Sequence, residues 1–166
     1  LKIFIKLCKK KVGLVTDCVD KLILKNRSNN DFFKVLGGQF NNVKLIRELN
    51  KIGKPVYFSN RGLKENDEKK LINFIKNKKN CHIIHTQLKT SRRFSNLKKI
   101  TKLKKILNDK VSFGSHCDDQ NIIFNSLKFK PKKIFFYIKD NKDLDYPDKS
   151  YAIPLNKIKR LLKGLK

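Results

Sequence analysis

The sequence predicts a three-layer α/β domain with a mostly parallel sheet. Short apolar runs alternate with longer amphipathic runs, and repeated strand–helix alternation is typical of parallel α/β domains. Residues 134–138, Ile-Phe-Phe-Tyr-Ile, are continuously apolar, as expected for a strand that is covered on both faces. The length of 166 residues suits one domain with a short extension. We expect an extension or arm over residues 1–40 and the α/β domain over residues 41–166.

The expected strands are apolar runs bounded by residues that favour turns or caps. Pro55 leads into the first run, Asn80 precedes the second, and Gly114 ends the third. The runs are short, as is usual for strands inside a parallel sheet. These considerations place strands at residues 56–58, 81–85, 111–113 and 134–138.

The amphipathic runs between these strands are expected to form helices. Asn41 or Asn42 can cap a helix whose apolar residues recur on one face from Val43 to Ile52. Gly53 suits the end of that helix, because glycine adopts positive φ at little cost. The other expected helices cover residues 63–78, residues 91–107, a segment that begins after Asp118 or Asp119, and residues 156–165.

Net charge is the strongest signal in the composition. There are 41 Lys and Arg residues against 14 Asp and Glu, which gives +27 at pH 7. Such an imbalance destabilises a compact chain by self-repulsion, and nucleic-acid phosphate is the usual partner that relieves it. An AT-rich gene would also raise the Lys and Asn content, but it does not explain why Asp and Glu are scarce. The composition therefore favours nucleic-acid binding. No apolar run reaches the roughly 18 residues of a membrane span.

One expected helix, residues 91–107, has only cations on its solvent side. A solvated helix usually mixes both signs in i,i+4 pairs. Arg61 and Lys89 follow the carboxyl ends of two expected strands, which share one rim in a parallel sheet, and the basic helix begins at that rim. The alternative is that these side chains only face water. We predict an RNA-binding surface made of Arg61, Lys89, Arg92, Arg93, Lys98, Lys99 and Lys102.

Motifs for catalysis and cofactor binding are missing from the sequence. Neither GxGxxG nor GxxxxGK[ST] occurs, and Gly37-Gly38 is more typical of a turn than of a nucleotide site. Ser115, His116 and Cys117 follow an expected strand without the GxSxG spacing of a nucleophile elbow. We therefore predict no catalytic residue, no cofactor and no small-molecule substrate.

A metal site is not predicted either. The cysteines lack CxxC spacing, and the pairs Cys81-His82 and His116-Cys117 could ligate zinc only if the fold brought them together. Adjacent strand residues point to opposite faces, so each pair offers one ligand easily. The acidic loop at residues 140–148 lacks the Gly and the final Glu of an EF-hand.

Three segments resemble those of a known family. Residues 85–90, His-Thr-Gln-Leu-Lys-Thr, resemble an L-T-N-F-K-T segment that is also followed by a basic helix. Residues 56–61 resemble a strand that ends in F-V-G-T-K, and residues 151–156 resemble Y-P-I-P-G-N. In this order and spacing, from about Val43 onward, the segments resemble the ribosomal protein S2 family. The W-L-G-G stretch of that family is lost, and its long helical hairpin is cut down to a few residues around Asn108.

The resemblance implies a flavodoxin-like αβα domain with a reduced helical hairpin insertion and without catalytic activity. It implies a structural constituent of the small ribosomal subunit, bound to rRNA and to other small-subunit ribosomal proteins. The AT-rich bias suggests an organelle-encoded protein of the mitochondrion. Two alternatives stay open. One is an RNA-modifying, methyltransferase-like enzyme, which would need a Gly-rich cofactor loop, and the other is a free nucleic-acid-binding module.

Overall fold

The computed structural model describes residues 13–16, 30–86, 96–117, 119–140, 148 and 150–164. The chain forms two compact units, Leu1–Ile83 and Ile84–Lys166, so that their boundary falls within one strand. The elements are β1 Gly13–Thr16, β2 Phe32–Val35, the 3-10 turn η2 Gly37–Gln39, α3 Val43–Ile52, β3 Val56–Ser59, α4 Glu65–Lys76, β4 Cys81–Thr86, α5 Lys98–Leu107, the 3-10 turn η4 Asn108–Lys110, β5 Val111–Gly114, α6 Asn121–Leu127, β6 Ile134–Phe135, β7 Ile138–Lys139, β8 Ile153–Pro154 and α7 Leu155–Gly164.

The strands β1 to β6 are hydrogen-bonded in the order of the sequence. In the first unit β2 lies between β1 and β3, and both pairings are parallel. In the second unit β5 pairs in parallel with β6, and β7 pairs in parallel with β8. The predicted α/β class with a mostly parallel sheet is confirmed.

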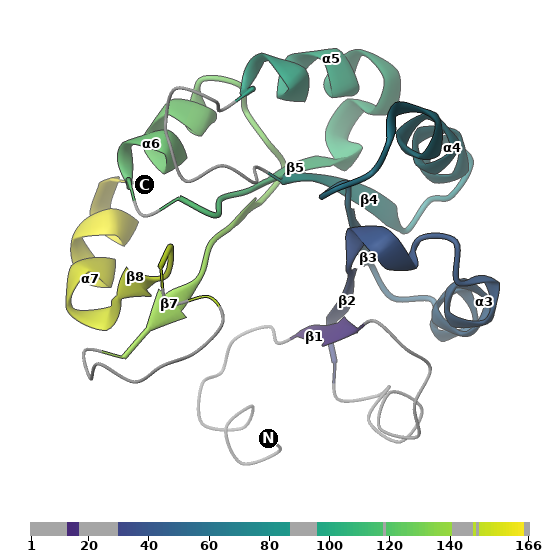
Figure 1. Cartoon of the computed structure of the whole chain (residues 1–166), viewed down its shortest axis with the longest axis horizontal. Coiled ribbons are helices and arrows are strands. Elements are labelled where there is room, and N and C mark those ends of the chain that lie inside the picture. The colour runs from purple at the N-terminus through teal and green to yellow at the C-terminus, as the bar shows by residue number, and fades with distance from the viewer. Residues whose placement is uncertain are drawn as a thin grey trace. The chain divides into compact units, whose positions relative to one another are not determined.

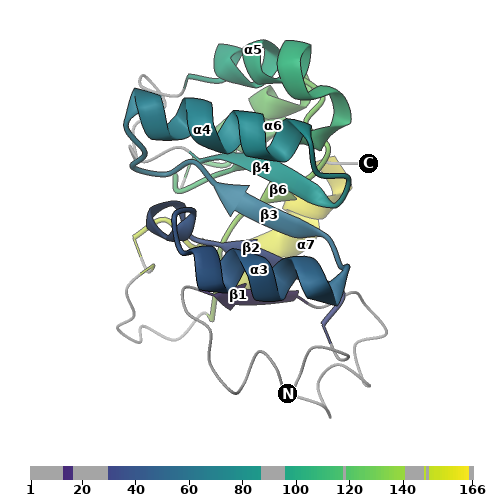
Figure 2. The same cartoon turned by 90° about the vertical axis from the view of Figure 1, so that its right-hand side faces the viewer.

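The strand order of the first unit is sequential. A flavodoxin-like sheet has its first strand between the second and third, whereas here β2 is the central strand of the three. The strands of this unit therefore pair in sequence order, and not in the flavodoxin-like strand order that the resemblance implies. Right-handed crossovers between strands added in sequence order leave the connecting helices on one face, and α3 and α4 both lie in front of the strands in Figure 2. Repeats of this kind build (β/α)8 barrels.

The core of the first unit lies between its strands and these two helices. Phe33 and Val35 of β2 are fully buried, as are Leu45 of α3 and Leu71 of α4. The predicted helix signals are confirmed at both ends of α3. The Asn42 side chain accepts a hydrogen bond from the Leu45 amide at 3.1 Å, and Gly53 ends the helix at φ 71°.

The core of the second unit is formed by helix faces packed on β5. Buried residues of α5 and α6 are Ile100, Leu103, Ile122 and Ile123. In Figure 1 these two helices lie on the same side of β5. The Asp119 carboxylate accepts a hydrogen bond from the Asn121 amide at 2.9 Å, which fixes the start of α6. Asp119 is one of the two predicted caps, and the other, Asp118, lies outside the described residues.

Two predicted elements differ from the structure. Residues 134–138 form two short strands, β6 and β7, separated by Phe136 and Tyr137, and their side chains are half-buried or exposed. The basic helix begins at Lys98, and residues 91–95 lie outside the described residues. Strands β1 and β2 lie within residues 1–40, and the domain division at residue 40 stays a prediction. No helix in the described part of the chain is long and apolar enough to cross a membrane.

Candidate active site

Polar residues gather at the carboxyl ends of the strands in each unit. In parallel β/α repeats this is the edge where functional side chains are usually found, because the loops that follow the strands meet there. In the first unit the residues come from the ends of β2 and β3. In the second unit they come from the ends of β4, β5 and β6.

Lys34 is the unusual residue of the first unit. Its neighbours Phe33 and Val35 are fully buried in the core, and strand alternation directs Lys34 to the opposite face of β2. Lys34 is nonetheless only 8% exposed. Lysine is almost never buried unless it is paired, because desolvating an ammonium group is costly, and Lys34 does have an interaction partner in the structure. A buried cation on the face away from the helices is suited to bind an anionic group.

The turn after β2 packs directly against the turn after β3. A Cβ atom at Gly37 would collide with the carbonyl oxygen of Arg61 and lie 3.0 Å from that of Ser59. The Ser59 hydroxyl accepts a hydrogen bond from the Arg61 amide at 3.1 Å, and the Asn60 amide group donates to Glu68 at 2.6 Å. The backbone at this edge of the first unit is therefore held by several contacts. The predicted turn at Gly37-Gly38 is the 3-10 turn η2.

His85 stands at the carboxyl end of β4 in the second unit and is buried. Its Nε2 lies 3.0 Å from the carbonyl oxygen of Asn96. A carbonyl oxygen can only accept, so Nε2 carries the hydrogen, and a neutral ring keeps its lone pair on Nδ1. The ring centroid lies 6.4 Å from that of Phe113. The imidazole is thus held in one tautomer and in one orientation.

His116 follows β5 and is enclosed by two tyrosines. Its Nε2 lies 3.3 Å from the Tyr137 hydroxyl, and its ring centroid lies 4.9 Å from Tyr137 and 4.6 Å from Tyr151. The Tyr151 hydroxyl donates a hydrogen bond to the Asp148 carboxylate. His116 itself is 3% exposed. A buried imidazole in contact with a phenol hydroxyl can accept or donate a proton away from bulk water.

The close approach of β4 to β5 explains why residue 114, near these histidines, is a glycine. A Cβ atom at Gly114 would lie 2.9 Å from Cγ2 of Ile84 and 3.2 Å from Oγ1 of Thr86. The Ser115 hydroxyl then accepts a hydrogen bond from the Cys117 amide at 3.3 Å. These contacts fix the turn that carries His116. Ser115 is buried and supports this turn.

Metal ligands do not gather in the described part of the chain. No group of three or more His, Cys, Asp or Glu side chains in these residues could hold a metal ion. Cys81 and Cys117 are buried and are not joined in a disulfide. They belong to different units.

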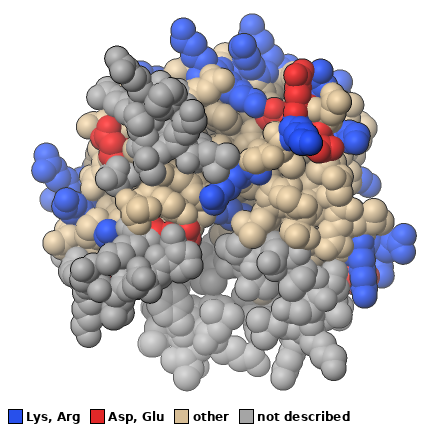
Figure 3. Space-filling view, in the orientation of Figure 1, with Lys and Arg blue, Asp and Glu red and all other residues tan. Residues whose placement is uncertain are grey.

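The structure places part of the predicted RNA-binding surface. Lys98 and Lys102 are exposed on α5 and Lys99 is half-buried, while the opposite face of the helix packs on the core. Arg61 is exposed and belongs to the first unit. Figure 3 shows Lys and Arg scattered over the visible face. No observation tests whether these residues touch phosphate. The other predicted residues, Lys89, Arg92 and Arg93, lie outside the described residues.

Comparison with known proteins gives one family and a consistent set of solved structures. The model of the NeuB family matches residues 14–166. No curated protein matches the chain. A putative spore coat polysaccharide biosynthesis protein E from Chromobacterium violaceum is similar with a TM-score of 0.81 and 17% identity, over 96% of this chain and 49% of that one.

Two further solved structures are similar at low identity. An N-acetylneuraminic acid (sialic acid) synthetase from Leptospira borgpetersenii has a TM-score of 0.78 and 16% identity, over 90% of this chain and 54% of that one. A phospho-2-dehydro-3-deoxyheptonate aldolase (DAHP synthase) from Thermotoga maritima has a TM-score of 0.80 and 12% identity, over 99% and 52%. The chain thus spans about half the length of these proteins, and the likeness shows the fold.

These findings overturn the resemblance to the ribosomal protein S2 family. The NeuB match covers residues 14–166, whereas the ribosomal resemblance rested on three short segments next to strands. The predicted role in the small ribosomal subunit, the rRNA and ribosomal-protein partners, and the RNA-modifying and nucleic-acid-binding alternatives are wrong. The predictions of no enzyme and no small-molecule substrate are also wrong. The 3-10 turn at Asn108–Lys110 simply connects α5 to β5 and is no reduced hairpin. The mitochondrial location stays a prediction.

Proposed function

The chain belongs to the NeuB family, and from that premise we propose that it acts in the synthesis of a 3-deoxy-2-keto sugar acid. Such an acid forms when a three-carbon donor, phosphoenolpyruvate, is joined to an aldose. N-acetylneuraminic acid and 3-deoxy-D-arabino-heptulosonate 7-phosphate, the products that give two similar proteins their names, are both acids of this kind. The match over residues 14–166 is the observation that carries the proposal.

The net reaction sets the chemical demands on the protein. The methylene carbon of phosphoenolpyruvate forms a bond to the aldehyde carbon of the sugar, and the aldehyde oxygen gains a proton. The oxygen of water adds to the carbon that carries the phosphate ester, and inorganic phosphate leaves. The protein must therefore bind a carboxylate and a phosphate, and it must move protons to and from oxygen atoms.

Lys34 supports the first demand. It is a buried cation at a face that the helices do not cover, where a low dielectric strengthens its attraction for an anion. The neighbouring turns after β2 and β3 are fixed by the contacts of Gly37, Ser59 and Asn60. Lysine acts on phosphate as a point charge. We assign Lys34 to binding the anionic donor.

His116 supports the second demand. Its contact with the Tyr137 hydroxyl gives a proton path between an imidazole and a phenol at 3.3 Å. His85 is held in the tautomer with its hydrogen on Nε2 by the Asn96 carbonyl oxygen. We assign His116 to proton transfer and His85 to a supporting role in orienting the substrate.

The test is phosphate release from phosphoenolpyruvate in the presence of an aldose. Suitable aldoses are N-acetylmannosamine and erythrose 4-phosphate. They are the sugars that remain when the three-carbon unit is removed from the two products named above. Aldose-dependent release with formation of a 2-keto acid, detected by mass spectrometry, supports the proposal. His116→Gln should lower kcat by about 100-fold, with an unchanged circular dichroism spectrum. Phosphate release that is independent of every aldose, or absent from the folded protein, would contradict the proposal.

A further inference from the structure

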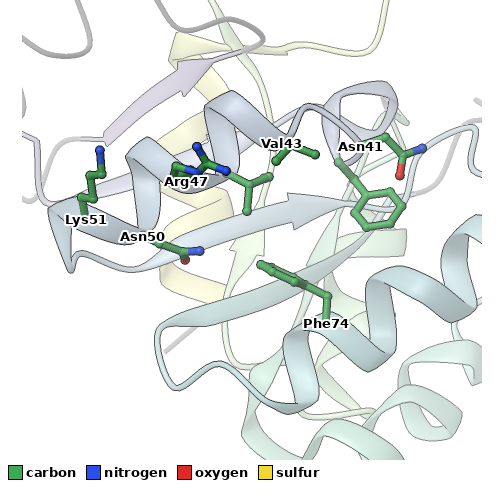
Figure 4. A pocket seen from close by; sticks show the side chains of 8 residues that line it. Asn41, Val43, Arg47, Asn50, Lys51 and Phe74 are labelled. Atoms are coloured by element: carbon green, nitrogen blue, oxygen red, sulfur yellow. The ribbon is translucent and has the colours of Figure 1, made fainter.

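A groove of about 690 Å³ runs along α3 in the first unit. Figure 4 shows the α3 side chains on one side of it and the Phe74 ring of α4 on the other. The volume lies within the range of small-molecule sites. The groove is lined by Phe40, Asn41, Val43, Ile46, Arg47, Asn50, Lys51 and Phe74.

The walls of the groove are apolar and well fixed. Phe74 packs edge-to-face against Phe58 in the core, with ring centroids 5.7 Å apart. Val43 is 68% exposed although it is apolar. Since the first turn of α3 is fixed by the Asn42 cap, Val43 is held at the mouth of the groove. An exposed aliphatic side chain beside two aromatic rings offers a surface for a flat apolar body.

The charge along the groove has one sign. Arg47 and Lys51 are one helical turn apart on α3, and no acidic residue lines the groove. Lys51 is paired with Glu48 at 2.9 Å. Arg47 has no ion-pair partner among the described residues. The groove therefore combines apolar walls with an available guanidinium, which prefers a carboxylate or sulfonate.

We propose that this groove binds a small amphipathic anion, with a flat apolar body and one carboxylate or sulfonate group. The body lies against Val43 and Phe74, and the anion pairs with Arg47. The sugar and phosphate groups of the proposed substrates are too polar for these walls, so this is a site separate from the proposed reaction. Its test does not depend on activity.

The experiment is a fluorescence titration of the full chain with 8-anilinonaphthalene-1-sulfonate, an aromatic sulfonate. Arg47→Gln should weaken binding about 1.5-fold to fivefold, since exposed ion pairs contribute about 0.2–1 kcal/mol. Val43→Asp should weaken it about tenfold or more, because it removes apolar contact and adds a like charge. The helix dipole stabilises an acidic residue in the first turn of a helix, so the Val43→Asp protein should stay folded. Lys44→Gln is the matched control, an exposed cation of α3 outside the groove.

An uncharged analogue, N-phenyl-1-naphthylamine, separates charge from apolar contact. Its affinity should not change in Arg47→Gln and should fall in Val43→Asp. The proposal is overturned if Arg47→Gln and Val43→Asp bind the sulfonate as tightly as Lys44→Gln does, since the dye then binds elsewhere on a protein of charge +27. It is also overturned if Arg47→Gln weakens both dyes equally.

Discussion

Gly37 and Gly38 are adjacent in one turn, and the structure predicts opposite effects when each is changed to alanine. A Cβ atom at Gly37 would collide with the Arg61 carbonyl oxygen and lie 3.0 Å from the Ser59 carbonyl oxygen. At Gly38 no described atom would lie within 4 Å of it. Neither glycine has positive φ, so the comparison isolates the collision from backbone strain.

The magnitudes follow from two opposing effects. Alanine restricts the unfolded chain, which stabilises a protein by about 0.4–1 kcal/mol where the native backbone accepts it. Gly38→Ala should show this gain alone. Overpacking costs about 1–3 kcal/mol, and at Gly37 the obstacle is backbone, which cannot move aside as a side chain can. Gly37→Ala should therefore destabilise the protein by about 1–2 kcal/mol after the gain is subtracted.

Urea denaturation followed by circular dichroism measures both variants against the parent protein. Gly37→Ala should unfold at lower urea and melt about 2–8 °C lower, the shift expected for a chain of this size. Gly38→Ala should unfold at equal or higher urea. Equal stability of the two variants would show that the turns after β2 and β3 do not pack as described.

The remaining predictions concern a cap, the two proposed site groups and the net charge. Asn42→Ala should lower the free energy of unfolding by about 0.5–2 kcal/mol, while Asn41→Ala leaves it nearly unchanged, as thermal melts will show. Lys34→Met should raise KM for phosphoenolpyruvate far more than it lowers kcat; equal changes in both would contradict a binding role. Tyr137→Phe should lower kcat about tenfold and leave KM unchanged, which steady-state kinetics will decide. The melting temperature at about 0.5 M salt should be higher than the melting temperature at low salt, because salt screens the repulsion between the positive charges of the chain.

Much of the fold follows from local signals in the sequence. Apolar runs predict β3, β4 and β5, because burial on both faces demands continuous apolar residues. Asn42 and Gly53 predict the ends of α3, because capping depends on neighbouring residues alone. The run before Gly37-Gly38 is strand-like, but Lys34 interrupts it, so Phe32–Val35 is not among the predicted strands. A lysine within such a run is unusual, and that departure from the pattern could have drawn attention to Lys34.

The candidate site was harder to predict from the sequence, because its residues come from strands that lie far apart in the sequence. His85 and His116 are separated by a helix, and their positions depend on the close approach of β4 and β5 at Gly114. His116 was considered only for zinc and for a nucleophile elbow, since local motifs describe sites built within one turn. The partners Tyr137 and Tyr151 belong to later segments. A search for polar residues at the last position of each expected strand, and at the few positions after it, would have found both histidines.

The wrong prediction of an RNA-binding function came from relying on the net charge of the chain. Net charge bears on solubility and on non-specific association, and it does not specify a fold. The buried residues of the helix α5 are Ile100, Leu103 and Leu107, so packing against the core does not require lysine at its other positions. The three short segments on which the ribosomal resemblance rested carry Thr and Lys, side chains that can bind the phosphate of RNA or of a small substrate. They therefore could not distinguish the two. The family match over residues 14–166 distinguishes them, because it depends on residues along most of the chain and not on three short segments.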